Sequence, residues 1–376
     1  MITYITLFYL PLSIKLFRKI EIKNYLRFLL MFLLVLIIGL RHEIGGDFFS
    51  YAHAGRIGGY YRTIDDTLLS LIYLISYEYL FLGIYGVQLI CAIIFILSLN
   101  IFLSSLKDYE LGLIIFIPVG IIIGAMGYLS QTLALSFGML AINSINRKQY
   151  VNYFIFVLLG SLSHISGLFF LIFSLAYFKF NLQNIIKVSI IGIICFLILY
   201  YLNKEEIDRT IYYYLGAGKH LISLGALPRY FFSIISSLLF LFYIRKRIVN
   251  SNLKKVNTIF SLLVIILLPL IFLSSTFVDR VNLYLIPFQA YVLTTFINLL
   301  GHNYIKRLIN SVVIILYGCS LLVWLILGSH SQHWLPYKIF PLQYCISDNL
   351  YEYFCEYFSY EPNIIYEEPQ DYDLPR

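Results

Sequence analysis

Charged residues are scarce in this chain. Only 12% of its 376 residues are Asp, Glu, Lys or Arg, whereas 60% are hydrophobic. The mean hydropathy is +0.82. A soluble domain has too small an interior to bury that much apolar surface, so the composition excludes a soluble globular protein. It predicts an all-α polytopic membrane protein instead.

Several chemical signatures are also missing. The chain has no metal-ligand spacing, no phosphate-binding glycine loop, no serine nucleophile elbow and no internal repeat. His330 and His333 form at most half a metal site, because no third ligand stands out nearby. Of the five cysteines, three lie in apolar stretches. The sequence leaves open whether the other two, Cys345 and Cys355, form a disulfide. We therefore expect neither a metal nor another cofactor.

Apolar stretches divide the chain into about twelve membrane passages, including a short broken hairpin. A full span needs ~20 residues, and some of these stretches are shorter. The first has no small-residue cleavage site, so we interpret it as a retained span. They form a membrane domain over residues 1–340, followed by an acidic, partly disordered outer tail over 341–376. The predicted passages are residues 2–17, 25–40, 84–104, 109–126, 128–145, 150–163, 165–178, 185–201, 230–244, 256–273, 281–300 and 308–327.

The loops between these passages alternate in charge. Loops on one side carry 17 basic and three acidic residues, and those on the other side carry 10 basic and 17 acidic ones. By the positive-inside rule the basic side is cytoplasmic, so both termini are predicted outside. The net charge of +7 thus reflects topology and gives no reason to expect a nucleic-acid partner. The basic loops are residues 15–27, 107–110, 147–148, 179–187, 245–255 and 306–307.

Positive charge on the predicted outer side comes mainly from arginine. Topology does not require it there, and a planar guanidinium can bind phosphate oxygens in a bidentate fork. The set as a whole therefore favours a phosphate ligand. For any single arginine, pairing with a carboxylate is an equal alternative, as Arg280 could do with Asp279; Tyr284 lies one turn from Arg280 on the same helix face. The outer arginines are Arg41, Arg56, Arg62, Arg209, Arg229, Arg280 and Arg376.

A run rich in Gly and Ser, residues 160–167, interrupts the apolar segment 150–178. A single crossing here would place every later basic loop outside, so charge balance requires two short passages joined by a turn. Each arm of ~14 residues rises only ~21 Å, less than the ~30 Å of hydrocarbon. The turn should therefore lie at the floor of an outward-facing cavity. His164, within it, is either functional or a hydrogen-bonded core histidine.

The loop after the second passage is polar and contains Arg41, Glu43, Asp47 and Tyr51. Arginines and carboxylates at the mouth of a membrane span indicate binding or chemistry on a charged ligand. Asp47 could instead cap a short helix, a position that aspartate favours whatever the loop does. We expect residues 67–82, which follow this loop, to form an outer interfacial helix.

These features resemble the Wzy/EpsG family of polysaccharide polymerases. Residues 163–166 are similar to the family's Phe-His-x-Ser element, and residues 280–284 and 334–338 are similar to late elements. The resemblance covers about residues 25–340. It rests on the order of these motifs along the chain and on the membrane topology more than on any single motif. The outer loop is similar to the family's Arg…Gly-Thr-Asp-Tyr…Tyr motif at Arg41, Gly45, Gly46, Asp47 and Tyr51.

One position departs from the family pattern. Relatives usually have an arginine before a glutamine near the start of the fifth passage, and here Ser130 precedes Gln131. If that arginine helps to hold a phosphate in relatives, another must substitute in this chain, or the substrate contacts differ.

The resemblance implies a membrane glycosyltransferase. Such an enzyme transfers a growing glycan from undecaprenyl pyrophosphate onto the non-reducing sugar of a new lipid-linked repeat unit. A general base must accept the proton of the acceptor hydroxyl, and arginines stabilise the departing pyrophosphate. The base candidates are Asp47, which we favour, Glu43 and His164. The substrate-binding candidates are Arg41, Tyr51, Arg229, Arg280, Tyr284, Trp334 and Tyr337.

The expected setting is the cytoplasmic (inner) membrane, and the expected product is O-antigen or capsular polysaccharide. The expected partners are the undecaprenyl-pyrophosphate-linked glycan, membrane lipid, a chain-length regulator and a flippase. Alternatives are a lipid-linked oligosaccharide flippase, which should have internal repeats, and an O-antigen ligase, which would use the same donor. A membrane O-acyltransferase would place its polar residues toward the cytoplasm.

Overall fold

The computed structural model describes residues 1–17, 19–56, 66–177, 223, 225–328 and 330–340. Most of these residues are helical, and this part of the chain contains no β-strand, only an isolated antiparallel bridge between Arg41 and Ile339. Within it, five helices are long and apolar enough to cross a membrane alone, and four further apolar helices are shorter. The fold is an all-α polytopic membrane protein, as the composition predicted.

Eleven of the twelve predicted passages coincide with helices. The other, residues 185–201, lies outside the described residues, as does the tail over 341–376. The passage helices are α1 (Ile2–Lys15), α2 (Ile20–Gly39), α5 (Gly83–Ser104), α6 (Tyr109–Phe116) with η3 (Ile117–Ala125), α7 (Leu129–Asn146), α8 (Tyr150–Ser163), η4 (Ile165–Tyr177), α11 (Ala226–Leu239) with η7 (Phe240–Ile244), α12 (Ser251–Leu267) with η8 (Pro269–Phe272), α13 (Ser275–Leu299) and α14 (Asn303–Leu327).

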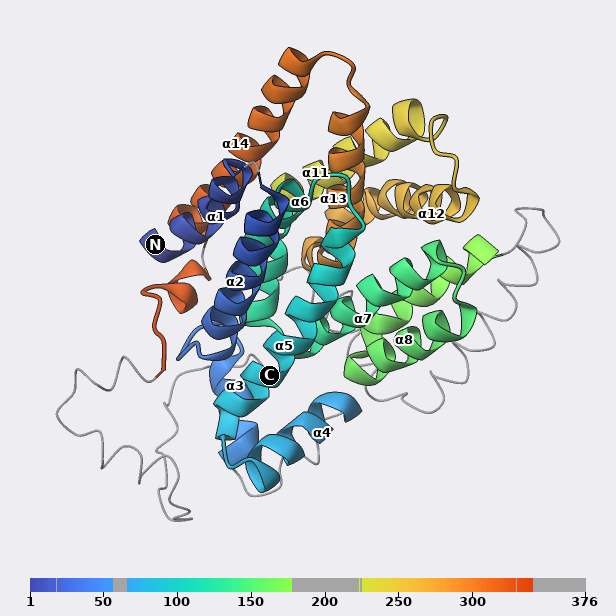
Figure 1. Ribbon diagram of the computed structural model, residues 1–376. Coiled ribbons are helices and arrows are strands. Elements are labelled where there is room, and N and C mark those ends of the chain that lie inside the picture. Colours follow the sequence, from blue (N-terminus) through green and yellow to red (C-terminus); the bar gives the residue numbers. More distant parts are fainter. Residues whose placement is uncertain (18, 57–65, 178–222, 224, 329, 341–376) are drawn as a thin grey trace.

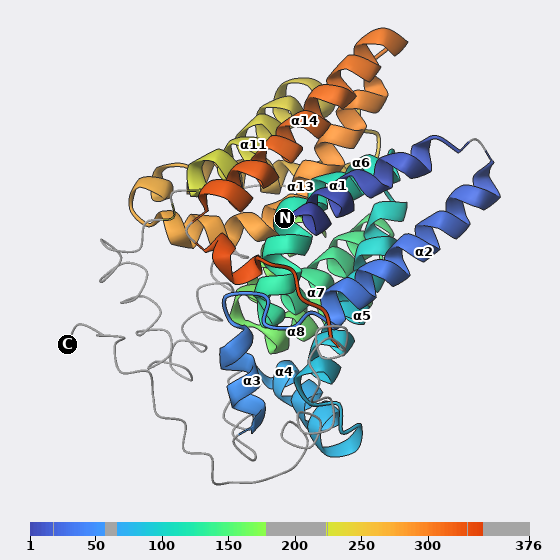
Figure 2. The ribbon, with the colours of Figure 1, turned by 90° about the vertical axis from the view of Figure 1, so that its left-hand side faces the viewer.

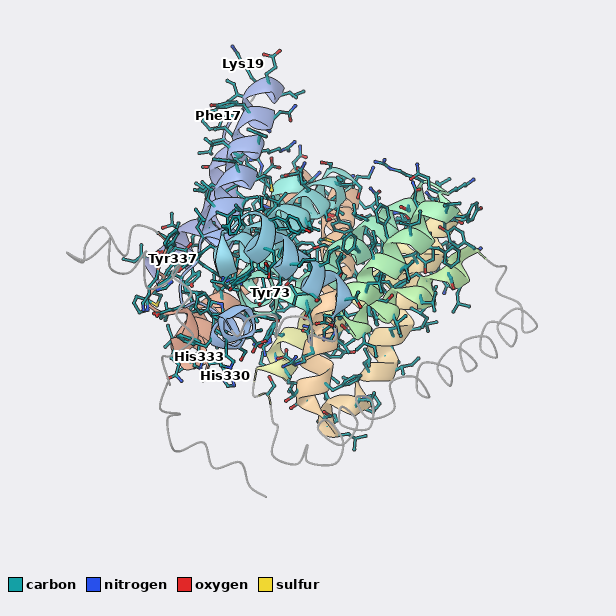
Figure 3. All side chains as sticks on the ribbon, turned by 90° about the horizontal axis from the view of Figure 1, so that it is seen from below. Phe17, Lys19, Tyr73, His330, His333 and Tyr337 are labelled. Atoms are coloured by element: carbon teal, nitrogen blue, oxygen red, sulfur yellow. The ribbon has the colours of Figure 1, made fainter. Side chains whose placement is uncertain are left out.

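Shorter helices gather at one end of the bundle. The turns that join α1 to α2 and α13 to α14 lie at the upper end in Figure 1, whereas α3 and α4 lie at the lower end. After α14 the chain runs back toward α3 (Figure 2). Seen from below, His330, His333 and Tyr337 lie along one edge, far from Lys19 (Figure 3). The short helices are α3 (Phe48–Arg56), α4 (Thr67–Leu74), η2 (Ile75–Tyr79) and η9 (Ser331–Trp334).

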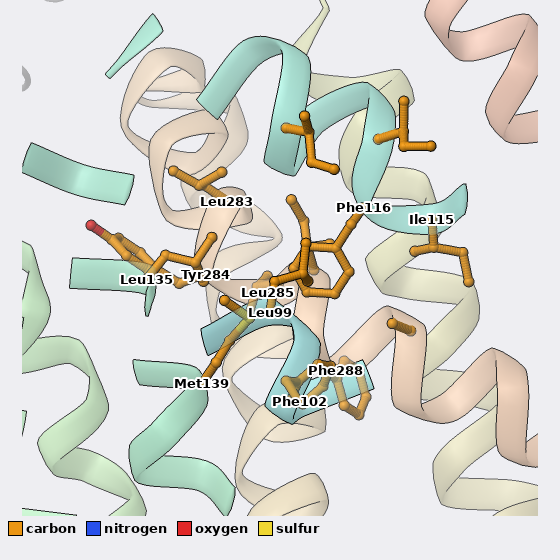
Figure 4. Packing of buried hydrophobic residues seen from close by; sticks show 14 of the residues in the cluster. Leu99, Phe102, Ile115, Phe116, Leu135, Met139, Leu283, Tyr284, Leu285 and Phe288 are labelled. Atoms are coloured by element: carbon orange, nitrogen blue, oxygen red, sulfur yellow. The ribbon is translucent and has the colours of Figure 1, made fainter. Parts of the chain in front are cut away.

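The core lies where α5, α6, α7 and α13 meet (Figure 4). Helices in lipid gain little from the hydrophobic effect, so close packing holds them together and favours small residues at contacts. Gly138 of α7 is one such residue, since a Cβ there would lie 2.0 Å from the ring of Phe170 in η4. Tyr284 joins the cluster with its hydroxyl directed away from it. The buried side chains include Leu99, Phe102, Phe116, Leu135, Met139, Leu285 and Phe288.

Backbone pairing joins the loop after α2 to the segment around η9. The amide of His42 donates to the carbonyl of Lys338 (3.1 Å), and that of Gly45 donates to the carbonyl of His333 (3.0 Å). Gly45 has a φ of 104°, and a Cβ there would lie 2.2 Å from the carbonyl oxygen of Met126. Both facts require glycine at this position. This joint, residues 40–45 with 333–340, fixes where the loop enters α3.

Candidate active site

Arg280, near the start of α13, interacts electrostatically with two residues from distant parts of the chain, Asp47 and His164. Arg280 lies in the second turn of α13, Asp47 directly precedes α3, and His164 occupies the turn between α8 and η4. The charge of Arg280 acts on both Asp47 and His164. Burial raises the pKa of the Asp47 carboxyl, and the positive charge of Arg280 opposes that rise. One cation therefore influences two groups that can exchange protons.

An aromatic platform supports Arg280. Its guanidinium carbon lies 5.2 Å from the ring centroid of Tyr128, which directly precedes α7. A cation is attracted to the negative face of such a ring. Two residues on, Ser130 hydrogen-bonds to Tyr51, whose amide donates to the carbonyl of Asp47 at 3.0 Å. Sequence reasoning missed Tyr128, because an aromatic residue at the edge of a passage is an ordinary feature.

Arg229 lies beside this cluster but binds a carboxylate. Its Nε donates to Asp279 Oδ1 at 2.8 Å, and its Nη2 donates to Asp279 Oδ2 in a short hydrogen bond. The hydroxyl of Ser223 donates to Asp279 Oδ2 at 3.0 Å. The sequence had left open whether Asp279 pairs with Arg280. In the structure its forked partner is Arg229, from α11.

His164 is held by a chain of hydrogen bonds. The amide of Ser166 donates to His164 Nδ1 at 3.1 Å, and the Ser166 hydroxyl lies 2.5 Å from the same nitrogen. That hydroxyl also makes a short hydrogen bond with the hydroxyl of Tyr284 in α13. Tyr284 is buried and stacks on Phe169, with ring centroids 5.6 Å apart. The predicted His164 and Tyr284 thus belong to one unit, and Ser166 links them.

Glu43, another candidate base, interacts with two basic residues of the joint, His42 and Lys338. One oxygen pairs with Lys338, and the other lies 3.6 Å from His42 Nε2. His42 Nδ1 is 2.6 Å from the hydroxyl of Tyr85. Burial lowers the pKa of His42, although neighbouring Glu43 opposes the shift. Both carboxylate oxygens of Glu43 therefore face partners within the joint.

Arg41, Trp334 and Tyr337 are packed into the same joint. Arg41 is 1% exposed, and its Nη1 donates to the carbonyl of Ile38 at 2.6 Å. The Tyr337 hydroxyl donates to the carbonyl of Ile37 at 2.7 Å, and Trp334 Nε1 donates to a carbonyl of η3 at 2.8 Å. The last carbonyls of a helix have no partner within it, so Arg41 and Tyr337 complete the end of α2. Burial lowers the pKa of Arg41 to about 10.

Three of the outer arginines, Arg62, Arg209 and Arg376, lie outside the described residues. Among the residues that the structure does describe, no three His, Cys, Asp or Glu side chains gather as metal ligands would.

A family comparison covers most of the chain. The model of the EpsG family matches residues 24–339, a range that contains Asp47, His164 and Arg280. The chain belongs to the EpsG family. No curated protein and no solved structure was found to match it. Membership in the EpsG family indicates a membrane protein of polysaccharide biosynthesis, with a polymerase-type, glycosyltransferase-like function.

Proposed function

We propose that this protein polymerises undecaprenyl-pyrophosphate-linked repeat units into O-antigen or capsular polysaccharide. The reaction is a metal-independent glycosyl transfer at the outer face of the cytoplasmic membrane. One observation carries the proposal: Arg280 acts on both Asp47 and His164, which come from separate segments of an EpsG-family membrane fold. An arginine, a carboxylate and an imidazole supply the charge and proton chemistry that transfer from a pyrophosphate needs.

In this reaction the bond between the anomeric carbon and the pyrophosphate oxygen breaks as the acceptor hydroxyl attacks. Arg280 stabilises the negative charge that develops on the departing pyrophosphate. Asp47 accepts the proton of the attacking hydroxyl, and its raised pKa makes it a better base than an exposed aspartate. A single direct displacement inverts the anomeric configuration.

Arg280 also offers a substitute for the arginine that relatives usually carry and that Ser130 replaces in this chain. Its guanidinium lies over Tyr128, two residues before Ser130, near the place where relatives carry their arginine. We assign Arg280 the phosphate-binding role there. Arg229, Arg41, Trp334 and Tyr337 hold α13 and the loop of Asp47 in place through the contacts described above.

A gene deletion examined on a glycan gel tests this function. Loss of the polymer ladder, with a single repeat unit still attached to its acceptor, supports a polymerase. Total loss of attached glycan indicates a flippase or a ligase, and an unchanged ladder contradicts all three. Complementation with the unaltered gene must restore the ladder. The chain-length regulator and the flippase that we expect as partners should remain present in the deletion strain.

A further inference from the structure

The hydrogen bonds of His164 determine which of its nitrogens carries the proton. A backbone amide is always a donor, so the bond from Ser166 N at 3.1 Å makes His164 Nδ1 an acceptor. A proton on Nδ1 would point at the amide hydrogen. The neutral ring therefore carries its proton on Nε2.

Ser166 and Tyr284 reinforce this state. With Nδ1 as acceptor, the Ser166 hydroxyl, 2.5 Å away, donates to it. The hydroxyl of Ser166 then accepts a hydrogen bond from the hydroxyl of Tyr284. The chain of donors therefore runs from Tyr284 through Ser166 to His164 Nδ1. Within the described part of the chain, the hydrogen bonds to the His164 ring all go to Nδ1. Nε2–H remains a donor on a ring that is only half-buried.

The surroundings also oppose a second proton on the ring. An imidazolium would place a hydrogen on Nδ1 against the amide of Ser166, and its charge would lie near that of Arg280. A neutral ring with Nε2–H cannot accept a proton from a sugar hydroxyl at Nε2. It can donate a hydrogen bond to an anionic oxygen, the same kind of ligand that Arg280 attracts.

We propose that Ser166 and Tyr284 are positioning residues that fix His164 as an Nε2–H donor to a diphosphate oxygen of the lipid-linked substrate. This inference rests on the proposed function for its ligand, a polyprenyl diphosphate. It leaves Asp47 as the proton acceptor and gives His164 and Arg280 a shared role in binding the leaving group.

The tautomer can be measured without any substrate. In the full-length protein in liposomes, labelled with ¹⁵N-histidine, the His164 signals are those absent from His164→Gln. We expect an unprotonated Nδ1 and a protonated Nε2 near neutral pH. Ser166→Ala should produce a mixture of tautomers, whereas Ser161→Ala, one turn earlier, should not. A protonated Nδ1 in the unaltered protein would overturn the assignment.

A second measurement tests the ligand. Farnesyl diphosphate should shift the Nε2 signal, and farnesol, which lacks the diphosphate, should not. Equal shifts with both, or no shift with either, would contradict the diphosphate contact. The tautomer result stands independently of the deletion strain, so a failure of the polymerase assignment can be told apart from a failure of this one.

Activity measurements complete the test. Ser166→Ala should lower polymerisation about 2–10-fold, as expected for one neutral hydrogen bond. His164→Leu, which has no donor, should lower it about 10–100-fold, and His164→Gln, whose amide can donate, should retain most activity. Equal loss in His164→Gln and His164→Leu would contradict the donor role. It would indicate that imidazole acts by accepting a proton, and His164 would then replace Asp47 as the assigned general base.

Discussion

Arg229 grips Asp279 in a forked ion pair, and Asp279 is the residue immediately before Arg280. The pair joins α11 to the first turns of α13, and both side chains are largely buried. It neutralises Asp279, which would otherwise weaken the positive field of Arg280. Two arginines that look alike in the sequence therefore have different surroundings: Arg229 binds a carboxylate, and the charge of Arg280 acts on Asp47 and His164.

This division predicts a specific double-mutant result. Arg229→Gln and Asp279→Asn should each lower activity and stability, because each leaves the partner's charge buried and unpaired. The double variant should be less impaired than the two single effects combined, with a coupling energy of about 0.5–3 kcal/mol from thermal unfolding in detergent. If Arg229 binds pyrophosphate directly, the double variant will be at least as inactive as Arg229→Gln alone.

Arg280 should not tolerate replacement by lysine. Arg280→Lys keeps the charge but loses the planar fork and its contact with the ring of Tyr128. We expect polymerisation to fall about 10²-fold, the effect of removing one good donor to a developing negative charge. The matched control is Arg245→Lys, at an exposed position in a predicted cytoplasmic loop, which should be nearly silent. Equal activities in the two variants would exclude forked recognition by Arg280.

The fold could be predicted well from the sequence because hydropathy marks the apolar segments and loop charge shows how many passages each of them makes. The contacts between passages could not be predicted in this way. Asp279 and Arg280 are neighbours in the chain, yet consecutive helical residues point in different directions and do not face each other. The true partner of Asp279 comes from α11, and no pattern in a single sequence reveals that two helices lie side by side.

The electrostatic coupling within the site could be anticipated only in part, for a similar reason. Charge and polarity in a membrane protein drew attention to Asp47, His164 and Arg280, and in the structure the charge of Arg280 acts on the other two. Their catalytic and binding roles stay predictions. The same reasoning predicted Arg41 as a ligand-binding arginine, and that role stays a prediction; it did not reveal that the guanidinium of Arg41 donates to the carbonyl of Ile38 near the end of α2. Burial of Arg41 depends on the segment around η9, almost 300 residues later, which local sequence cannot report.

Asp47 should control the acidic limb of the pH profile. As a base it acts when deprotonated, so activity should be lost as pH falls through its raised pKa. Arg280 lowers that pKa, so Arg280→Gln should move the limb of the residual activity to higher pH, whereas Arg245→Gln should not. Asp47→Asn should lose about 10²–10⁴-fold activity. Initial rates with lipid-linked repeat units in proteoliposomes would show this; an unmoved limb in Arg280→Gln would contradict it.

Two adjacent glycines provide a matched test of the joint. Gly45→Ala places a Cβ 2.2 Å from the carbonyl oxygen of Met126 and requires a positive φ, which costs about 1–3 kcal/mol. Gly46→Ala meets nothing within 4 Å. We expect the first to lower the thermal unfolding midpoint of the detergent-solubilised protein clearly and the second to leave it almost unchanged. Similar midpoints would mean that the joint does not constrain the loop.

The orientation in the membrane that we predict from loop charge can be tested by labelling. In a background whose five cysteines are replaced, Ser50→Cys should react with an impermeant maleimide in intact cells, because α3 lies at the predicted outer end. Ser251→Cys, exposed beside the basic loop after α11, should react only after permeabilisation. Both positions are exposed, so accessibility within the fold does not distinguish them. Labelling of Ser251→Cys in intact cells would reverse the topology and place Asp47, His164 and Arg280 on the cytoplasmic side, where polymerisation of exported repeat units could not occur.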